Sequence, residues 1–208
     1  MNKYSLILFN LNGHILDSRL LFMKSFLSLY DNLEMKIISF DKLLSSINEA
    51  NNYLSFNDDF KNIDYETLLD TFKRIVSSNI SSVLLYKDEM KILNSLKKEK
   101  VSLYTYSYRE DNELLSIYSK SDIKEILKKI ELNTFFDNHL IIDDKRKLEE
   151  EFSSFILKEG YSNDDALVIK KKEEINNLNA ISCIFNDNYS KDNIIDSYQE
   201  LEKYINVK

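Results

Sequence analysis

The sequence predicts an α/β protein with a parallel sheet and an inserted helical unit, and three observations carry this prediction. Residues 5–9 form a nearly continuous apolar run that ends in a turn, which is typical of a short strand buried on both faces of a parallel sheet. After residue 83, strand patterns alternate with helical patterns, as in sheets built from right-handed crossovers. Residues 17–82 carry helical patterns only. We therefore expect an α/β core from residues 1–16 and 83–208, and an all-helical cap from residues 17–82; the alternative is an extra helical layer with no part in a site.

The spacing of apolar residues gives the individual elements in order. Apolar residues three or four positions apart predict helices, and short continuous or alternating apolar runs predict strands. Asp17 or Ser18 is placed to cap the first helix, and Gly160 to end a later one in the left-handed conformation. The predicted helices span residues 17–32, 40–54, 65–76, 89–98, 110–119, 122–130, 148–159 and 194–205. The predicted strands span residues 5–9, 101–106, 166–169 and 181–185.

Composition narrows the class of protein. The 208 residues are 43% hydrophobic and 12% aromatic, which is enough for one core, with or without a small inserted domain, and argues against disorder. The net charge of −7 does not favour a nucleic-acid-binding surface. The absence of proline and the many Asn, Lys and Ile residues are typical of an AT-rich genome.

The single cysteine and the N-terminal segment give information on the cellular compartment of the protein. Cys183 lies in an apolar run and is expected to be a small core residue, with a reactive thiol as the alternative. The apolar run near the N-terminus is too short for a signal peptide, and no run reaches the roughly 20 apolar residues of a membrane-spanning helix. We therefore expect a cytoplasmic protein with no membrane partner.

The turn after the first strand is the expected place of a functional site. It has the sequence Asn10-Leu11-Asn12-Gly13, and Gly13 is one of only two glycines in the chain. Glycine in that place suggests a backbone conformation, or a closeness of approach, that a Cβ atom would forbid. Open α/β sheets bind ligands outside the carboxyl ends of their strands.

Residues 10–18, NLNGHILDS, resemble the first motif of the haloacid dehalogenase-like (HAD) phosphohydrolases, which is Asp-x-Asp-Gly-Thr, two apolar residues and Asp-Ser after an apolar strand. Residues 85–107 are similar to the segment that leads to the second motif, which places that motif on Ser107, and residues 135–142 resemble the segment entering the third short strand. The resemblance is to the helical-cap branch, with its phosphoglycolate phosphatases and phosphoglucomutases. It covers nearly the whole chain and implies a Rossmann-like core with an inserted helical cap.

The resemblance implies a chemistry whose acidic groups are missing here. In the family, the first Asp attacks phosphorus and the second is general acid and base. These positions are Asn10 and Asn12 in this chain, and an amide is a very poor nucleophile with no proton that titrates near neutral pH. The fourth motif, which holds Mg²⁺ in the family, falls on residues 167–175 and places Lys170 and Glu174 on its two Asp positions. We therefore expect no catalytic residue, no Mg²⁺ site and no other cofactor.

The positions that bind phosphate in the family are better preserved in this chain than the acidic positions. Ser107 remains, and Lys145 or Lys147, on either side of Arg146, stands at the cation of the third motif. The backbone N–H groups of the turn from Asn10 through Leu11 and Asn12 to Gly13 are further candidates for holding an anion. The alternative is that residues 170–172 are a solvated lysine run neutralised by Glu173 and Glu174.

Two further alternatives concern the reaction. His14 occupies the Thr position of the first motif and is either a phosphoacceptor or, as is far commoner for such a residue, a hydrogen-bonding or surface histidine. For the whole protein, the first hypothesis is a pseudoenzyme that binds a protein partner or a small anionic ligand. The alternatives are a divergent phosphohydrolase of small phosphorylated metabolites and a structural subunit of a larger assembly.

Overall fold

A computed structural model of the chain describes residues 4–36, 54, 58–85, 89–109, 118–170, 175, 178–183 and 194–195. Its centre is a six-stranded sheet in the order β3-β2-β1-β4-β5-β6, in which every neighbouring pair is parallel. The strands are β1 (Leu6–Asn10), β2 (Ser102–Tyr108), β3 (Phe136–Ile142), β4 (Ala166–Lys170), β5 (Ala180–Cys183) and β6 (Ile194–Ile195). The parallel sheet predicted from the sequence is thus confirmed.

Strand β1 lies in the middle of the sheet, and all five of its residues are buried. From β1 the chain builds outward on one side through β2 and β3, and then crosses to the other side to form β4, β5 and β6. The direction of winding therefore reverses between β1 and β4. In open α/β sheets, such a reversal opens a crevice at the carboxyl ends of the two strands, where ligands bind.

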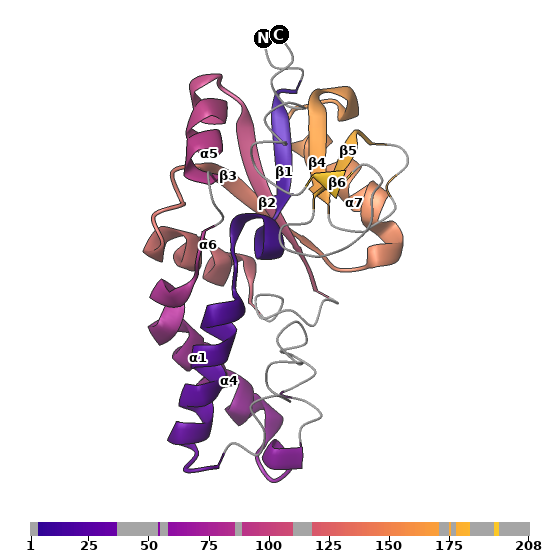
Figure 1. Cartoon of the computed structure of the whole chain (residues 1–208). Helices are drawn as coiled ribbons and strands as arrows, with labels where there is room; N and C mark the ends of the chain where they lie inside the picture. The colour runs from indigo at the N-terminus through magenta and orange to yellow at the C-terminus, as the bar shows by residue number, and fades with distance from the viewer. Residues whose placement is uncertain are drawn as a thin grey trace.

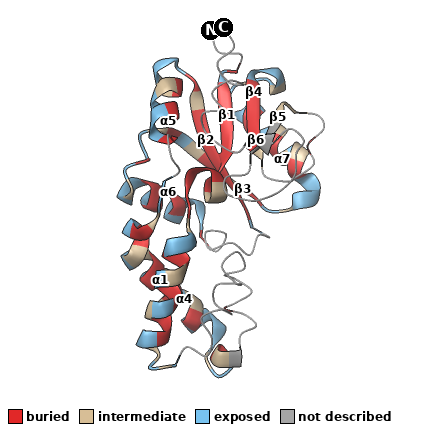
Figure 2. Cartoon of the chain, viewed as in Figure 1, coloured by how far each residue is buried: buried red, intermediate tan, exposed pale blue. Residues whose placement is uncertain are grey.

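The helices α5 (Glu89–Lys98), α6 (Lys120–Lys129) and α7 (Leu148–Lys158) cover the two faces of the sheet (Figure 1). One apolar cluster contains Leu103 of β2 with residues of α5 and α6, and a second contains Tyr104, Tyr106 and Tyr108 with residues of α7. Because side chains alternate along a strand, Thr105 and Ser107 share the face of Leu103. Figure 2 shows the buried residues concentrated on the central strands and on the helix sides that meet them.

Helices α1 (Arg19–Asn32) and α4 (Tyr65–Asn79) project beyond the carboxyl edge of the sheet (Figure 1). They pack on each other through Phe26, whose ring centroid lies 4.5 Å from that of Phe22 and 4.5 Å from that of Phe72. The same apolar cluster continues into the sheet through Phe9 of β1. Only helices and turns occur among the described residues of 18–82, with short helical segments η2 (Asp58–Phe60) and η3 (Ile80–Ser82).

Several helix predictions differ from the structure or lie outside the described residues. The predicted helix over residues 194–205 is wrong at its start, because Ile194 and Ile195 extend the sheet by pairing with Ser182 and Cys183. Residues 40–53 and 110–117, both expected to be helical, lie outside the described residues, as do residues 196–205. Gly160 does follow α7 with a φ of 88°, as predicted. No helix within the described ranges is long and apolar enough to cross a membrane.

Candidate functional site

The turn η1 (Leu11–Ile15) after β1 is held by its own hydrogen bonds. Asn10 Oδ1 accepts a hydrogen bond from the N–H of Asn12 at 3.1 Å, and the N–H of Gly13 donates to the carbonyl oxygen of Leu16 at 2.9 Å. Gly13 has a φ of 99°, which is the conformation that its identity suggested. Two of the backbone N–H groups expected to face an anion are therefore already used inside the turn.

One polar atom in the side chain of Asn10 has no partner among the residues that the structure describes. Asn10 is 1% exposed, and among the described residues no acceptor lies within hydrogen-bond distance of its Nδ2 atom. A buried donor without an acceptor costs about 1–3 kcal/mol. An acceptor oxygen supplied by a ligand at the end of β1 would remove this cost.

The side chain of Asn12 is also held within the turn. The Ser18 hydroxyl, at the start of α1, donates to Asn12 Oδ1 across 2.6 Å. The position that the sequence resemblance assigns to the general acid and base is thus a neutral amide bonded to a hydroxyl. This arrangement has no proton to exchange near neutral pH.

The strand register places Asn10 and Lys170 side by side at the carboxyl edge. Phe9 of β1 is paired with Ile169 of β4, so the residues that follow, Asn10 and Lys170, stand at the same level. On the other side, Asn10 is level with Tyr106, whose hydroxyl donates to the carbonyl oxygen of Ile169 at 2.8 Å. This hydrogen bond between the Tyr106 hydroxyl and the Ile169 carbonyl joins β2 to β4 across the end of β1.

The groups at this edge do not suit a divalent metal ion. Mg²⁺ prefers carboxylate and other oxygen ligands, whereas the ends of β1 and β4 carry the amide of Asn10 and the ammonium of Lys170. No group of three or more Asp, Glu, His or Cys side chains is placed to hold a metal in the part of the chain that the structure describes. Glu174, the other fourth-motif position, lies outside that part.

Ser107 lies near the end of β2 and is bonded to a histidine that the sequence analysis missed. Its Oγ atom is 3.0 Å from Nε2 of His139, and Nδ1 of His139 is 2.7 Å from Oγ1 of Thr105. His139 is 1% exposed on β3, next to β2. The one sequence signal was the spacing of Thr105 and Ser107, which places two hydroxyls on one strand face.

Burial lowers the pKa of His139 to about 3, and Lys120 at the start of α6 adds to this effect. In the unfolded chain the pKa is near the ordinary 6.5, so between these values the unfolded state binds a proton that the folded state does not. The free energy of unfolding therefore rises with pH across that interval and falls on acidification, with a limiting slope of about 1.4 kcal/mol per pH unit.

This predicts that His139→Gln flattens the acid side of the stability profile. We expect the wild type to lose about 1 kcal/mol more than the variant between pH 6 and pH 5, measured by urea unfolding. Only the slopes are compared, so a general destabilisation of the variant does not matter. Equal slopes would mean that His139 is not held neutral.

The structure separates the two candidate cations of the third motif. Lys145 Nζ lies 4.8 Å from the ring centroid of Tyr108, the last residue of β2. Arg146 forms an ion pair with Asp144 at 2.9 Å, and Lys147 is exposed at the start of α7. Of these, Lys145 is the one seen against the carboxyl edge of the sheet.

His14 is fully buried in the turn η1, with 0% exposure. The alternative that His14 is a surface residue is therefore wrong.

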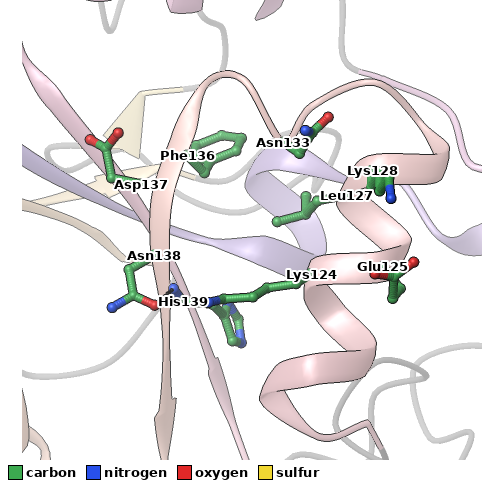
Figure 3. A pocket seen from close by; sticks show the side chains of 9 residues that line it. All are labelled: Lys124, Glu125, Leu127, Lys128, Asn133, Phe136, Asp137, Asn138 and His139. Atoms are coloured by element: carbon green, nitrogen blue, oxygen red, sulfur yellow. Dashed lines mark hydrogen bonds between the residues drawn. The ribbon is translucent and has the colours of Figure 1, made fainter.

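A groove of about 290 Å³ runs between α6 and β3 and has His139 among its lining residues (Figure 3). Its charged lining is exposed, as at Lys124 and Lys128, and Asp137 is already paired with Lys97 at 3.0 Å. Figure 3 shows the Lys124 side chain extending from α6 toward β3 beside His139. The groove borders the edge strand, away from the end of β1.

No family model matches the sequence, and no curated protein matches it. Solved structures do match over the full length. The HAD-hydrolase YfnB from Bacillus subtilis, described as bound to magnesium, has a TM-score of 0.71 at 16% identity, covering 99% of this chain and 100% of that one. The chain has the HAD-like fold.

Other matches show how widely this fold is used. A haloacid dehalogenase-like family hydrolase from Streptococcus pneumoniae has a TM-score of 0.66 at 14% identity over 97% of this chain and 98% of that one. Protein Tyrosine Kinase A from Mycobacterium tuberculosis has a TM-score of 0.66 at 11% identity over 99% of each chain. Proteins named as hydrolases and as a kinase thus share the HAD-like fold, so an activity has to be argued from the site.

Proposed function

We propose that this protein is a pseudoenzyme of the HAD-like fold that binds a small phosphorylated anion without hydrolysing it. The observation that carries the proposal is the buried amide of Asn10, whose Nδ2 atom has no acceptor among the described residues. A carboxylate at this position would repel a phosphoryl group. An amide N–H₂ there supplies a donor that the oxygen of an anion satisfies.

The charged and hydroxyl groups around this edge favour an anion as the ligand. Lys170 stands level with Asn10 on the neighbouring strand, and Lys145 lies against the end of β2. Ser107, one position beyond Tyr106 on β2, adds a hydroxyl at the same carboxyl edge, from the opposite face of the sheet. Two cations, an amide and a hydroxyl are a donor set suited to phosphoryl oxygens.

Hydrolysis has no support from the same residues. Neither Asn10 nor Asn12 offers a carboxylate to attack phosphorus or to exchange a proton, and Lys170 puts an ammonium where a metal ligand would be needed. A divergent phosphohydrolase and a protein-binding role without a small ligand are therefore outcomes that the experiments must separate.

Titration with inorganic phosphate, followed by calorimetry, tests the proposal and the choice between the two lysines. We expect saturable binding that weakens about 10-fold in Lys145→Gln, because a charge-assisted hydrogen bond is lost, and less than about 2-fold in Lys147→Gln. The reverse order would move the cation to Lys147. No saturable binding in the wild type would leave a protein partner as the remaining function.

A further inference from the structure

We propose that His139 is a positioning residue that, together with Thr105, turns the hydroxyl hydrogen of Ser107 away from the protein so that it is donated to the bound anion. The inference rests on the proposed function for the nature of the ligand. It adds a direction to each hydrogen bond in the chain from Thr105 through His139 to Ser107.

The first step is the hydroxyl of Thr105. Thr105 is 0% exposed, and its Oγ1 atom has one hydrogen-bond partner among the described side chains, Nδ1 of His139 at 2.7 Å. A buried hydroxyl hydrogen needs an acceptor, because leaving it unpaired costs the full desolvation of the group. If Nδ1 carried a proton, it would donate to Oγ1, and the hydrogen of Thr105 would have no acceptor among the described residues. Thr105 therefore donates, and Nδ1 is unprotonated.

The second step follows from the neutral state of the ring. A neutral imidazole with an unprotonated Nδ1 carries its proton on Nε2. Nε2 lies 3.0 Å from Oγ of Ser107, so its N–H donates to that oxygen. Both ring nitrogens are then satisfied inside the sheet, as a histidine with 1% exposure requires.

The third step is what this leaves for Ser107. Its oxygen already accepts a hydrogen bond from His139, so its own hydrogen cannot be given back to the ring. Ser107 is the last but one residue of β2 and keeps 8% exposure at the carboxyl edge. Its hydroxyl is thereby set as a donor, which suits a phosphoryl oxygen and would disfavour a ligand that presents donors of its own.

The direct test is the tautomer of His139 in solution, read from two-bond ¹⁵N–¹H couplings of the ¹⁵N-labelled protein without ligand. The chain has two histidines, so the loss of one set of signals in His139→Gln assigns the spectrum. We expect the pattern of an imidazole protonated at Nε2. A ring protonated at Nδ1 would overturn the inference, whatever the phosphate titration shows.

Two variants connect the tautomer to binding. Thr105→Val keeps the shape of the side chain and removes its hydroxyl, so it should raise the population protonated at Nδ1 and weaken inorganic phosphate binding roughly 5-fold. Thr105→Ser retains the hydroxyl, so the tautomer of His139 and the phosphate affinity should both stay at their wild-type values. An unchanged tautomer and affinity in Thr105→Val would contradict the inference. A ring protonated at Nε2 in a wild type that binds no phosphate would instead overturn the proposed function alone.

Discussion

Asn10→Asp is expected to weaken the binding of inorganic phosphate by at least about 100-fold. The change keeps the shape of the side chain, replaces the N–H₂ with a carboxylate oxygen, and puts a negative charge next to the ligand. Two like charges about 4 Å apart at an effective dielectric constant of about 20 repel by roughly 4 kcal/mol, so 100-fold is a cautious figure. Calorimetric titration of both proteins measures it.

A control separates this local effect from the change in net charge. Asn133→Asp adds the same charge at an exposed position beside α6, and we expect it to change phosphate affinity by less than about 2-fold, because exposed charges are screened by salt. Equal affinities of Asn10→Asp and the wild type would mean that the amide of Asn10 does not face the ligand. That result would remove the observation on which the proposed function depends.

Phe26→Ala is expected to destabilise the protein by about 3–5 kcal/mol, measured by urea unfolding. Phe26 is 0% exposed and lies between Phe22 and Phe72, so truncation leaves a cavity where α1 meets α4. Leu27, on the same helix but 37% exposed, is the matched position, and Leu27→Ala should cost less than about 1.5 kcal/mol.

Unfolding of Phe26→Ala also tests whether helices α1 and α4 unfold together with the sheet. The apolar cluster that contains Phe26 also contains Phe9 of β1. We therefore expect one cooperative transition for the wild type and for Phe26→Ala, with the whole transition moved to lower urea. A second transition in Phe26→Ala, with the sheet signal unchanged, would show that α1 and α4 form a separate unit.

The elements that the sequence predicted best are those with a strong local pattern. The apolar run near the N-terminus correctly predicted a strand over residues 5–9. The observed β1 begins and ends one residue later, because Ser5 is exposed and Asn10 still pairs with β2. Gly13 marked the turn because few other residues take a φ of 99°. Ile194 and Ile195 were assigned to a helix, since their strand exists only through pairing with β5, which local spacing does not reveal.

The site was predictable in its position but not in its bonding. The sequence placed Asn10 and Lys170 at strand ends, whereas only the register shows that they stand level on neighbouring strands. It could not show that Asn10 Oδ1 accepts a hydrogen bond from the N–H of Asn12, or that Nδ2 has no partner among the described residues. His139 was hidden in an apolar run, because its partners Thr105 and Ser107 lie more than thirty residues earlier in the chain.

The central claim is that this HAD-like fold binds a phosphoryl group that it cannot cleave. Incubation of the wild type with p-nitrophenyl phosphate and Mg²⁺, followed by ³¹P NMR, tests it most directly. The account predicts a saturable shift of the ester resonance, with no inorganic phosphate formed beyond a blank without protein. Release of phosphate above that blank, abolished in Asn10→Ala, would contradict it.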